Sequence, residues 1–141
     1  MSDMDNRQDA EWDILELMQL IQHNDEQAEY FFKEGCYITE LFNSPDDPAI
    51  SVAKARVEPS QTTRCDRLND SAEHYLSVEG TGLAEVGDEP AREVIAEDVV
   101  VIPAGVRQRI TNTGSNDLIF LAICTPRFVP ENYIDCEEEL E

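Results

Sequence analysis

The chain has 141 residues, a length typical of one domain, and 41% of them are hydrophobic, which is enough apolar material to form a core. Its 31 Asp and Glu against 10 Lys and Arg give a formal net charge of -21, which repels phosphate backbones and anionic lipid surfaces. We therefore expect neither a nucleic-acid nor a membrane partner.

The sequence carries no sign of export. No run of about 18 apolar residues is present, and the amino terminus lacks the basic and then apolar pattern of a signal peptide. We therefore expect a cytoplasmic protein. Its four cysteines have no CxxC spacing and are predicted to be free thiols, namely Cys36, Cys65, Cys124 and Cys136.

One segment has clear helical periodicity. Ile14, Leu17, Met18 and Ile21 recur at three- and four-residue spacing, which predicts an amphipathic helix over Asp9–His23. Its apolar stripe favours packing on the same domain or on a second copy, with a groove of another protein as the alternative.

After the helix, short apolar or β-branched runs alternate with turn residues, which is typical of an all-β sandwich or barrel. The predicted strands are Cys36–Phe42, Ile50–Val57, Glu73–Val78, Gly82–Val86, Val99–Ile102, Arg107–Asn112 and Leu118–Cys124. We predict three parts within one domain: an acidic N-terminal segment with the helix (1–34), an antiparallel barrel (35–130) and an acidic C-terminal tail (131–141).

Two segments resemble the paired motifs of the cupin superfamily. The first motif reads Gly, five residues, His-x-His, three or four residues, Glu, six residues, Gly, and its frame falls on Ser60, Asp66, Leu68, Glu73 and Gly80. The second reads Gly, five residues, Pro-x-Gly, two residues, His, three residues, Asn, and falls on Glu97, Pro103, Gly105, Gln108 and Asn112.

This resemblance covers about residues 36–127 and implies the cupin-type antiparallel β-barrel, a jelly roll or double-stranded β-helix, here with an N-terminal α-helix. It also implies a homodimer. It does not imply a reaction, because this superfamily places enzymes, ligand sensors and storage proteins on the same barrel.

The metal site of the family is the main departure. Relatives use three histidines and one glutamate, whereas the matching positions here are Asp66, Leu68, Glu73 and Gln108. We expect no cofactor. The alternative is a divalent metal on Asp66, Glu73 and Gln108, whose oxygen donors suit Mn, Mg or Ca, with Mn, Fe, Ni and Zn as the ions to supply in a test.

Strand alternation predicts which side chains face the inside of the barrel. The predicted interior, and with it the ligand-binding set, is Asp66, Leu68, Glu73, Tyr75, Gln108 and Ile110, with Arg127 at the rim. Two carboxylates facing one cavity repel, so either a cation neutralises them or one stays protonated. Glu73 is therefore the candidate general acid or base.

The neighbours of these residues have the opposite parity. Cys65 and His74 are predicted to be structural, and Lys54 and Arg56 to lie on the outer face, with the cavity as the alternative for the two cations. The preferred function is a small-molecule-binding cupin without the three-histidine site. The alternatives are a metal-dependent isomerase or dioxygenase and a non-catalytic dimerisation barrel.

Overall fold

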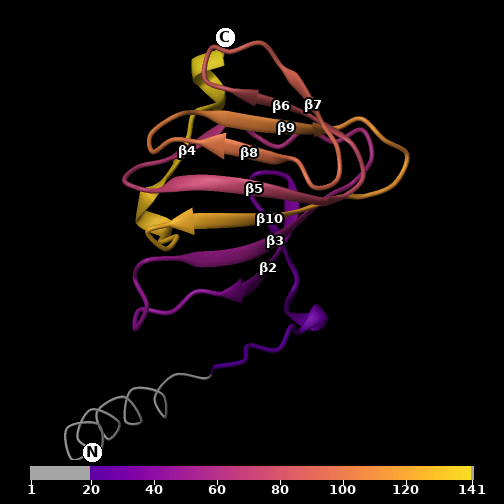
Figure 1. Cartoon of the computed structure of the whole chain (residues 1–141). Helices are drawn as coiled ribbons and strands as arrows, with labels where there is room; N and C mark the ends of the chain where they lie inside the picture. Colours follow the sequence, from indigo (N-terminus) through magenta and orange to yellow (C-terminus); the bar gives the residue numbers. More distant parts are fainter. Residues whose placement is uncertain (1–19, 141) are drawn as a thin grey trace, which may run out of the picture.

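Two antiparallel sheets make up residues 20–140, the part of the chain that the computed structural model describes (Figure 1). The six-stranded sheet has the order β1 (Tyr30–Phe32), β2 (Cys36–Phe42), β3 (Ser51–Val57), β10 (Leu118–Thr125), β5 (Ala72–Glu79), β8 (Val99–Ile102). The five-stranded sheet has the order β11 (Tyr133–Asp135), β4 (Asp66–Leu68), β9 (Gln108–Asn112), β6 (Gly82–Val86), β7 (Arg92–Val94). Three short 3₁₀ helices complete the described elements: η1 (Glu26–Ala28), η2 (Pro130–Asn132) and η3 (Glu137–Leu140).

Both sheets contribute to one hydrophobic core. Val57 and Leu118 from the first sheet and Ile110 from the second belong to the same cluster of buried side chains. Alternation produces this core, because every second side chain of a strand faces the same side. In β9, for example, Gln108, Ile110 and Asn112 are buried and the two residues between them are half-buried.

All seven predicted strands are present, with ends that agree to within one residue. Four strands were not predicted, namely β1, β4, β7 and β11. Each has three residues, which is too short for a period of two to stand out from the sequence. The class is all-β, as predicted.

The predicted helix Asp9–His23 lies mostly outside the described residues. Its predicted end does fall within them, and there the prediction is wrong: Leu20 and Ile21 form a bend and are 71% and 70% exposed. The Asp25 carboxylate accepts a hydrogen bond from the Gln27 amide and so begins a separate 3₁₀ turn. None of the described helices is long and apolar enough to cross a membrane.

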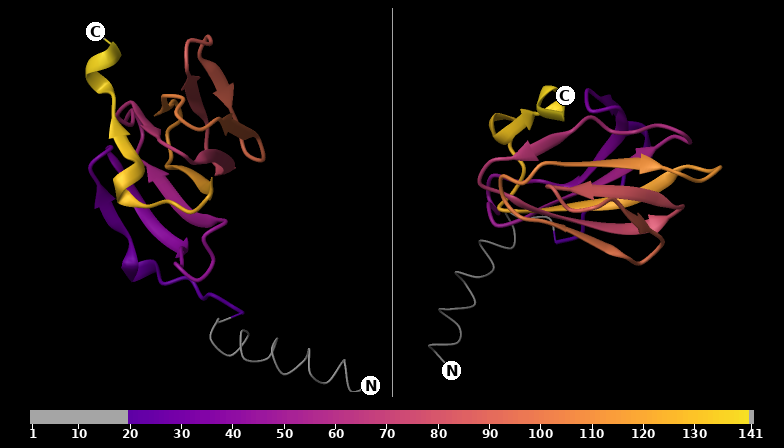
Figure 2. Two further views of the ribbon diagram at one scale, coloured as in Figure 1. Left: turned by 90° about the vertical axis from the view of Figure 1, so that its left-hand side faces the viewer. Right: turned by 90° about the horizontal axis from the view of Figure 1, so that it is seen from above.

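The C-terminal segment contributes a strand to the barrel. In β11, Tyr133 pairs with Leu68 and Asp135 with Asp66, so residues 133–135 become the outermost strand of the second sheet. Figure 2 shows this segment in yellow along one end of the barrel. Two ion pairs link β4 and the residues just before it to the C-terminal segment: Arg64 with Asp135 at 2.7 Å and Arg67 with Glu139 at 2.8 Å.

The turn between β5 and β6 depends on Gly80, whose φ is +87°. A Cβ at this position would lie 2.7 Å from the Asp117 carbonyl oxygen and 3.0 Å from the Leu118 Cα, both of which are backbone atoms. Gly80→Ala is therefore expected to lower the free energy of unfolding by about 2 to 4 kcal/mol, measured by urea denaturation.

Gly105→Ala is the matched control. Gly105 also has a positive φ, +79°, but a Cβ added there would meet no described atom within 4 Å. Only backbone strain remains, and the expected cost is about 1 kcal/mol. Equal losses in the two variants would contradict the assignment of the larger cost to the steric clash.

Candidate functional site

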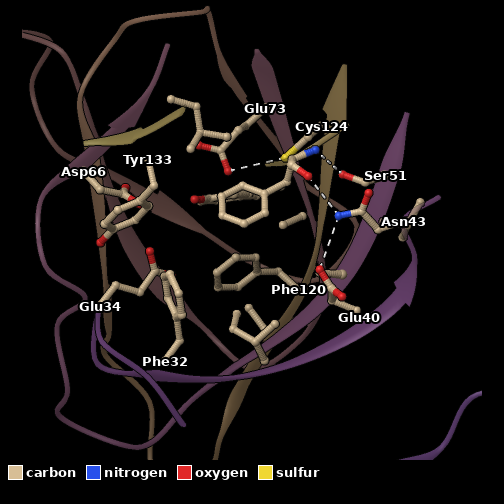
Figure 3. Close-up of a pocket in the computed structure, with 18 of the residues that line it drawn as sticks. Phe32, Glu34, Glu40, Asn43, Ser51, Asp66, Glu73, Phe120, Cys124 and Tyr133 are labelled. Carbon is tan, nitrogen blue, oxygen red and sulfur yellow. Dashed lines mark hydrogen bonds between the residues drawn. The ribbon is translucent and has the colours of Figure 1, made fainter. Parts of the chain in front are cut away.

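A cavity opens between the two sheets at the end where β1 and β11 lie. It has about 630 Å³ of empty space, its open mouth included. Figure 3 shows Glu34, Asp66, Glu73 and Tyr133 at one side of it. The water-accessible interior of the cavity is about 70 Å³, so an organic ligand would also occupy the open mouth.

Glu73 is the buried acid of β5. Strand alternation turns it inward together with Tyr75, and its side chain is only 6% exposed. The Cys124 thiol lies 4.0 Å from Oε2, whereas Oε1 is buried without any hydrogen-bond partner among the described residues. Burial, with repulsion from Glu34, raises the pKa of Glu73 to about 8, although the Tyr75 hydroxyl partly opposes this shift.

Asp66 is the second buried acid, at the start of β4. Its Cα is paired with that of Gln108, and the Gln108 carboxamide donates a hydrogen bond to Oδ1. Burial raises the pKa of Asp66 to about 11, and the negative charges of Glu34 and Glu73 add to the effect. Burial thus favours the protonated form of the Asp66 carboxyl, which can donate a hydrogen bond.

Glu34 is the third acid, and it lies in the turn between β1 and β2. Gly35 closes this turn with a φ of +94°, and its amide donates to the Phe32 carbonyl at 2.9 Å. The Arg64 amide donates to the Glu34 carbonyl at 2.7 Å, which fixes the turn beside β4. The Cys36 thiol donates to Glu34 Oε1 at 3.0 Å, and the Glu34 carboxyl lies close enough to Asp66 to raise the pKa of Asp66.

Aromatic rings form the walls next to these acids. Phe32 and Tyr133 meet edge to face with ring centroids 5.3 Å apart, and Tyr75 and Phe120 lie 4.5 Å apart. The Tyr133 hydroxyl is buried and has no hydrogen-bond partner in residues 20–140. Tyr133 and Glu73 thus present two unused polar atoms to the same cavity (Figure 3).

A polar network closes the other side of the cavity. The Asn43 carboxamide donates to the Phe128 carbonyl at 2.9 Å and to Glu40 at 3.3 Å, and the Phe128 amide donates to the Ser51 hydroxyl at 2.9 Å. Arg127 Nε donates to Asn43 Oδ1 at 2.8 Å. These side chains are already paired, unlike Glu73 Oε1 and the Tyr133 hydroxyl at the opposite side.

The structure buries all six side chains of the predicted interior, with exposures from 2% to 6%. Four of them line the cavity: Asp66, Leu68, Glu73 and Tyr75. Gln108 reaches it only through its hydrogen bond to Asp66, and Ile110 packs in the core. Arg127 does not line this cavity, but together with Lys33 it lines an adjoining cleft that shares Phe32 and Tyr133 with the cavity.

The residues of opposite parity lie elsewhere. Cys65 is buried against Cys136, with 3.0 Å between their sulfur atoms. Arg56 pairs with Glu29 at 2.8 Å and with Asp117 at 3.1 Å, and its guanidinium stacks 4.2 Å from the Tyr37 ring centroid. Neither Lys54 nor Arg56 is among the residues that line the cavity.

Sequence reasoning missed Glu34 and Tyr133. A Glu before a Gly in a Lys-Glu-Gly turn looks like a solvated loop residue, and Tyr133 lies in the segment predicted as a tail. Glu34 and the Tyr133 hydroxyl are buried by non-local pairings, which depend on the Arg64 amide for Glu34 and on β4 for Tyr133.

The donors at the family metal positions do not fit the imidazole-rich site of cupins. An Asp, a Leu, a Glu and a Gln replace three histidines and one glutamate, and the Gln108 carboxamide turns its nitrogen to Asp66. Within residues 20–140, no group of three or more His, Cys, Asp or Glu side chains has an arrangement that could hold a metal ion.

This chain is similar in fold to several solved structures. No protein-family model and no curated protein matches the chain. Among solved structures, KdgF from Halomonas sp. is 14% identical with a TM-score of 0.67, over 77% of this chain and 95% of its own. Streptomyces PAC13, solved as a variant with uridine, is 18% identical with a TM-score of 0.68, over 84% and 92%.

The cupin domain of Cnp3 from Schizosaccharomyces pombe is 12% identical with a TM-score of 0.60, over 74% of this chain and 68% of its own. These identities are low, so the shared feature is the arrangement of the strands. This shared arrangement, together with the two motif frames and the two-sheet barrel, shows that this chain has the fold of the cupin superfamily.

Proposed function

We propose that this protein binds a small molecule in the barrel cavity and does so without the three-histidine metal site of its superfamily. The observation that carries the proposal is the buried Glu73 Oε1, which faces the cavity without a partner among the described residues. A buried polar atom of this kind costs about 1 to 3 kcal/mol when it is left unsatisfied. A ligand that donates a hydrogen bond removes that cost.

Two further features support the proposal. The Tyr133 hydroxyl is unsatisfied in the same cavity, so the site offers two polar contacts. The walls are largely aromatic and aliphatic, which suits the apolar body of a ligand. Convergent polar groups in an apolar cavity are typical of small-molecule sites.

Acid–base catalysis on the bound molecule is a second candidate function. The pKa of Glu73, about 8, lies near neutral pH, where a carboxyl exchanges protons efficiently with a substrate. Asp66 remains protonated and supplies a second proton donor. One protein with a similar fold, Pac13, is described as a nucleoside dehydratase.

Filling the cavity tests the proposal. Uridine, benzyl alcohol and benzylamine serve as probes, and at least one is expected to bind the wild type saturably in isothermal titration calorimetry. Ala122→Phe adds a ring inside the cavity and is expected to weaken that binding at least tenfold. Ala104→Phe, in an exposed turn, is the matched control and should bind as the wild type does.

Circular dichroism shows whether Ala122→Phe folds, and Ala53→Phe, which also lines the cavity, replaces it if it does not. The proposal is overturned if no probe binds the wild type. It is equally overturned if a folded, filled variant binds as tightly as the control.

A further inference from the structure

The charge of the cavity wall indicates which class of ligand fits the cavity. This inference rests on the proposed function. Four acidic side chains line the cavity, and Lys, Arg and His are absent from its described lining. The acids are Glu34, Glu40, Asp66 and Glu73. Lys33 and Arg127 line only the adjoining cleft at the mouth. In the interior beside Glu73, an anionic ligand would therefore meet no compensating charge, whereas a cation would meet several acids.

Glu73 supplies a second and independent indication. Its Oε1 is an acceptor without a partner in the described chain, and the residue is more than nine-tenths buried. When Glu73 is ionised, the ligand group that faces it must carry an N–H or O–H. A primary ammonium group offers three such donors together with a positive charge.

The aromatic walls indicate where the rest of the ligand lies. Ring faces carry negative potential and attract ammonium groups within about 6 Å. Tyr133 already attracts one, because the exposed Lys33 places its Nζ 4.5 Å from the ring centroid. Phe32, Phe120 and Tyr133 also provide apolar surface for a hydrocarbon body.

We propose that the cavity binds a small organic cation, in which a primary ammonium group donates to Glu73 and an apolar or aromatic body packs against Phe32, Phe120 and Tyr133. A bare divalent metal ion would leave these walls unused. The net charge of -21 also raises the local concentration of cations around the protein.

Such a ligand would remove an electrostatic cost. Close carboxyl groups without a counter-charge are unfavourable when ionised, and burial increases the penalty. The titratable groups around Glu73 are all neutral or acidic: Glu34, Asp66, Tyr75, Cys124 and Tyr133. A bound ammonium stabilises the ionised Glu73, so binding releases a proton below the pKa of about 8.

Three probes that share a benzene ring separate charge from shape: benzylamine, benzyl alcohol and benzoate. Calorimetry at about pH 8 is expected to give benzylamine a Kd at least tenfold lower than that of benzyl alcohol, and no binding of benzoate. The Kd of benzylamine should rise about tenfold for each pH unit below 8, because Glu73 must lose its proton. The Kd of benzyl alcohol should change less than threefold.

Glu73→Gln keeps an acceptor and removes the charge. It is expected to raise the Kd of benzylamine at least tenfold and to change the Kd of benzyl alcohol less than about threefold. Glu79→Gln, at the exposed end of the same strand, is the control and should bind both probes as the wild type does. The pH series on the wild type needs no variant, so the test stands even if Glu73→Gln fails to fold. Release of protons on binding is read from titrations in two buffers of different ionisation enthalpy.

The outcomes separate this inference from the function on which it rests. If benzyl alcohol or uridine binds at least as tightly as benzylamine, the cation is wrong and the ligand cavity stands. If benzylamine binds with no pH dependence or no loss in Glu73→Gln, the cation is not held by Glu73 and the inference fails. If none of the probes binds, both proposals fail.

Discussion

Raising the pH from about 5 to about 8 is expected to destabilise the ligand-free protein by on the order of 4 kcal/mol through Glu73 alone. The pKa of this carboxyl is about 8 in the folded chain against 4.5 in the unfolded chain. Between these values the folded state binds more protons than the unfolded state, so the free energy of unfolding falls as the pH rises. The contribution is complete below about pH 4.5 and lost above about pH 8.

Asp66 acts with the same sign, because its pKa of about 11 also exceeds the ordinary value. The carboxyls of Glu29 and Asp135 act in the opposite sense. Their pKa values are lowered by hydrogen bonds from Arg56 and Arg64, so the stability that they contribute is lost in acid. Stability should therefore be greatest in mildly acidic solution.

Urea denaturation at several pH values measures this dependence, and Glu73→Gln isolates the Glu73 contribution. The variant cannot ionise, so it should become more stable than the wild type as the pH approaches 8. Glu79→Gln, whose parent side chain is exposed, should follow the wild type. If the free energy of unfolding changed with pH in the same way for the wild type and Glu73→Gln, the pKa of Glu73 would not be raised by burial.

Asn112→Ala is expected to lower the free energy of unfolding by about 3 kcal/mol or more. The Asn112 side chain is 1% exposed and donates to the carbonyls of Val57 and Asn116, both at 2.8 Å. Its Oδ1 accepts from the Gly114 amide at 2.8 Å. Alanine leaves two carbonyls and one amide without these partners, in a place where β3, β9 and the following turn meet.

Asn116→Ala is the control, because that side chain is exposed and only its backbone carbonyl takes part in the network. Its expected effect is within about 0.5 kcal/mol. Urea denaturation of the two variants under the same conditions gives the comparison. If Asn112→Ala lowered the free energy of unfolding no more than Asn116→Ala does, the hydrogen bonds of the Asn112 carboxamide would contribute little to stability.

Asn112 also shows what could be predicted from the sequence. Its place in the second motif frame and the alternation of Gln108 and Ile110 before it were sufficient to orient β9. The same reasoning oriented Glu73 and Tyr75 in β5. In both strands the local period of two coincides with burial on one face, so a pattern within five to eight residues carried the information.

The rest of the site depends on pairings between distant segments. Phe32 and Tyr133 belong to three-residue strands, in which no period is readable. Glu34 is polar and next to a glycine, which locally predicts an exposed turn, and only the tertiary contact with the Arg64 amide shows why it is buried. The number of acids in the cavity was therefore underestimated from the sequence.

The meeting of Phe32 with Tyr133 has a thermodynamic consequence. These rings belong to β1 and β11, three-residue strands at one edge of each sheet, and an edge strand with a single neighbour is expected to detach more easily than a central one. A molecule seated against both rings binds only when both strands are docked, so by mass action it opposes their detachment. A bound ligand is therefore expected to raise the free energy needed to detach β1 and β11 from the barrel.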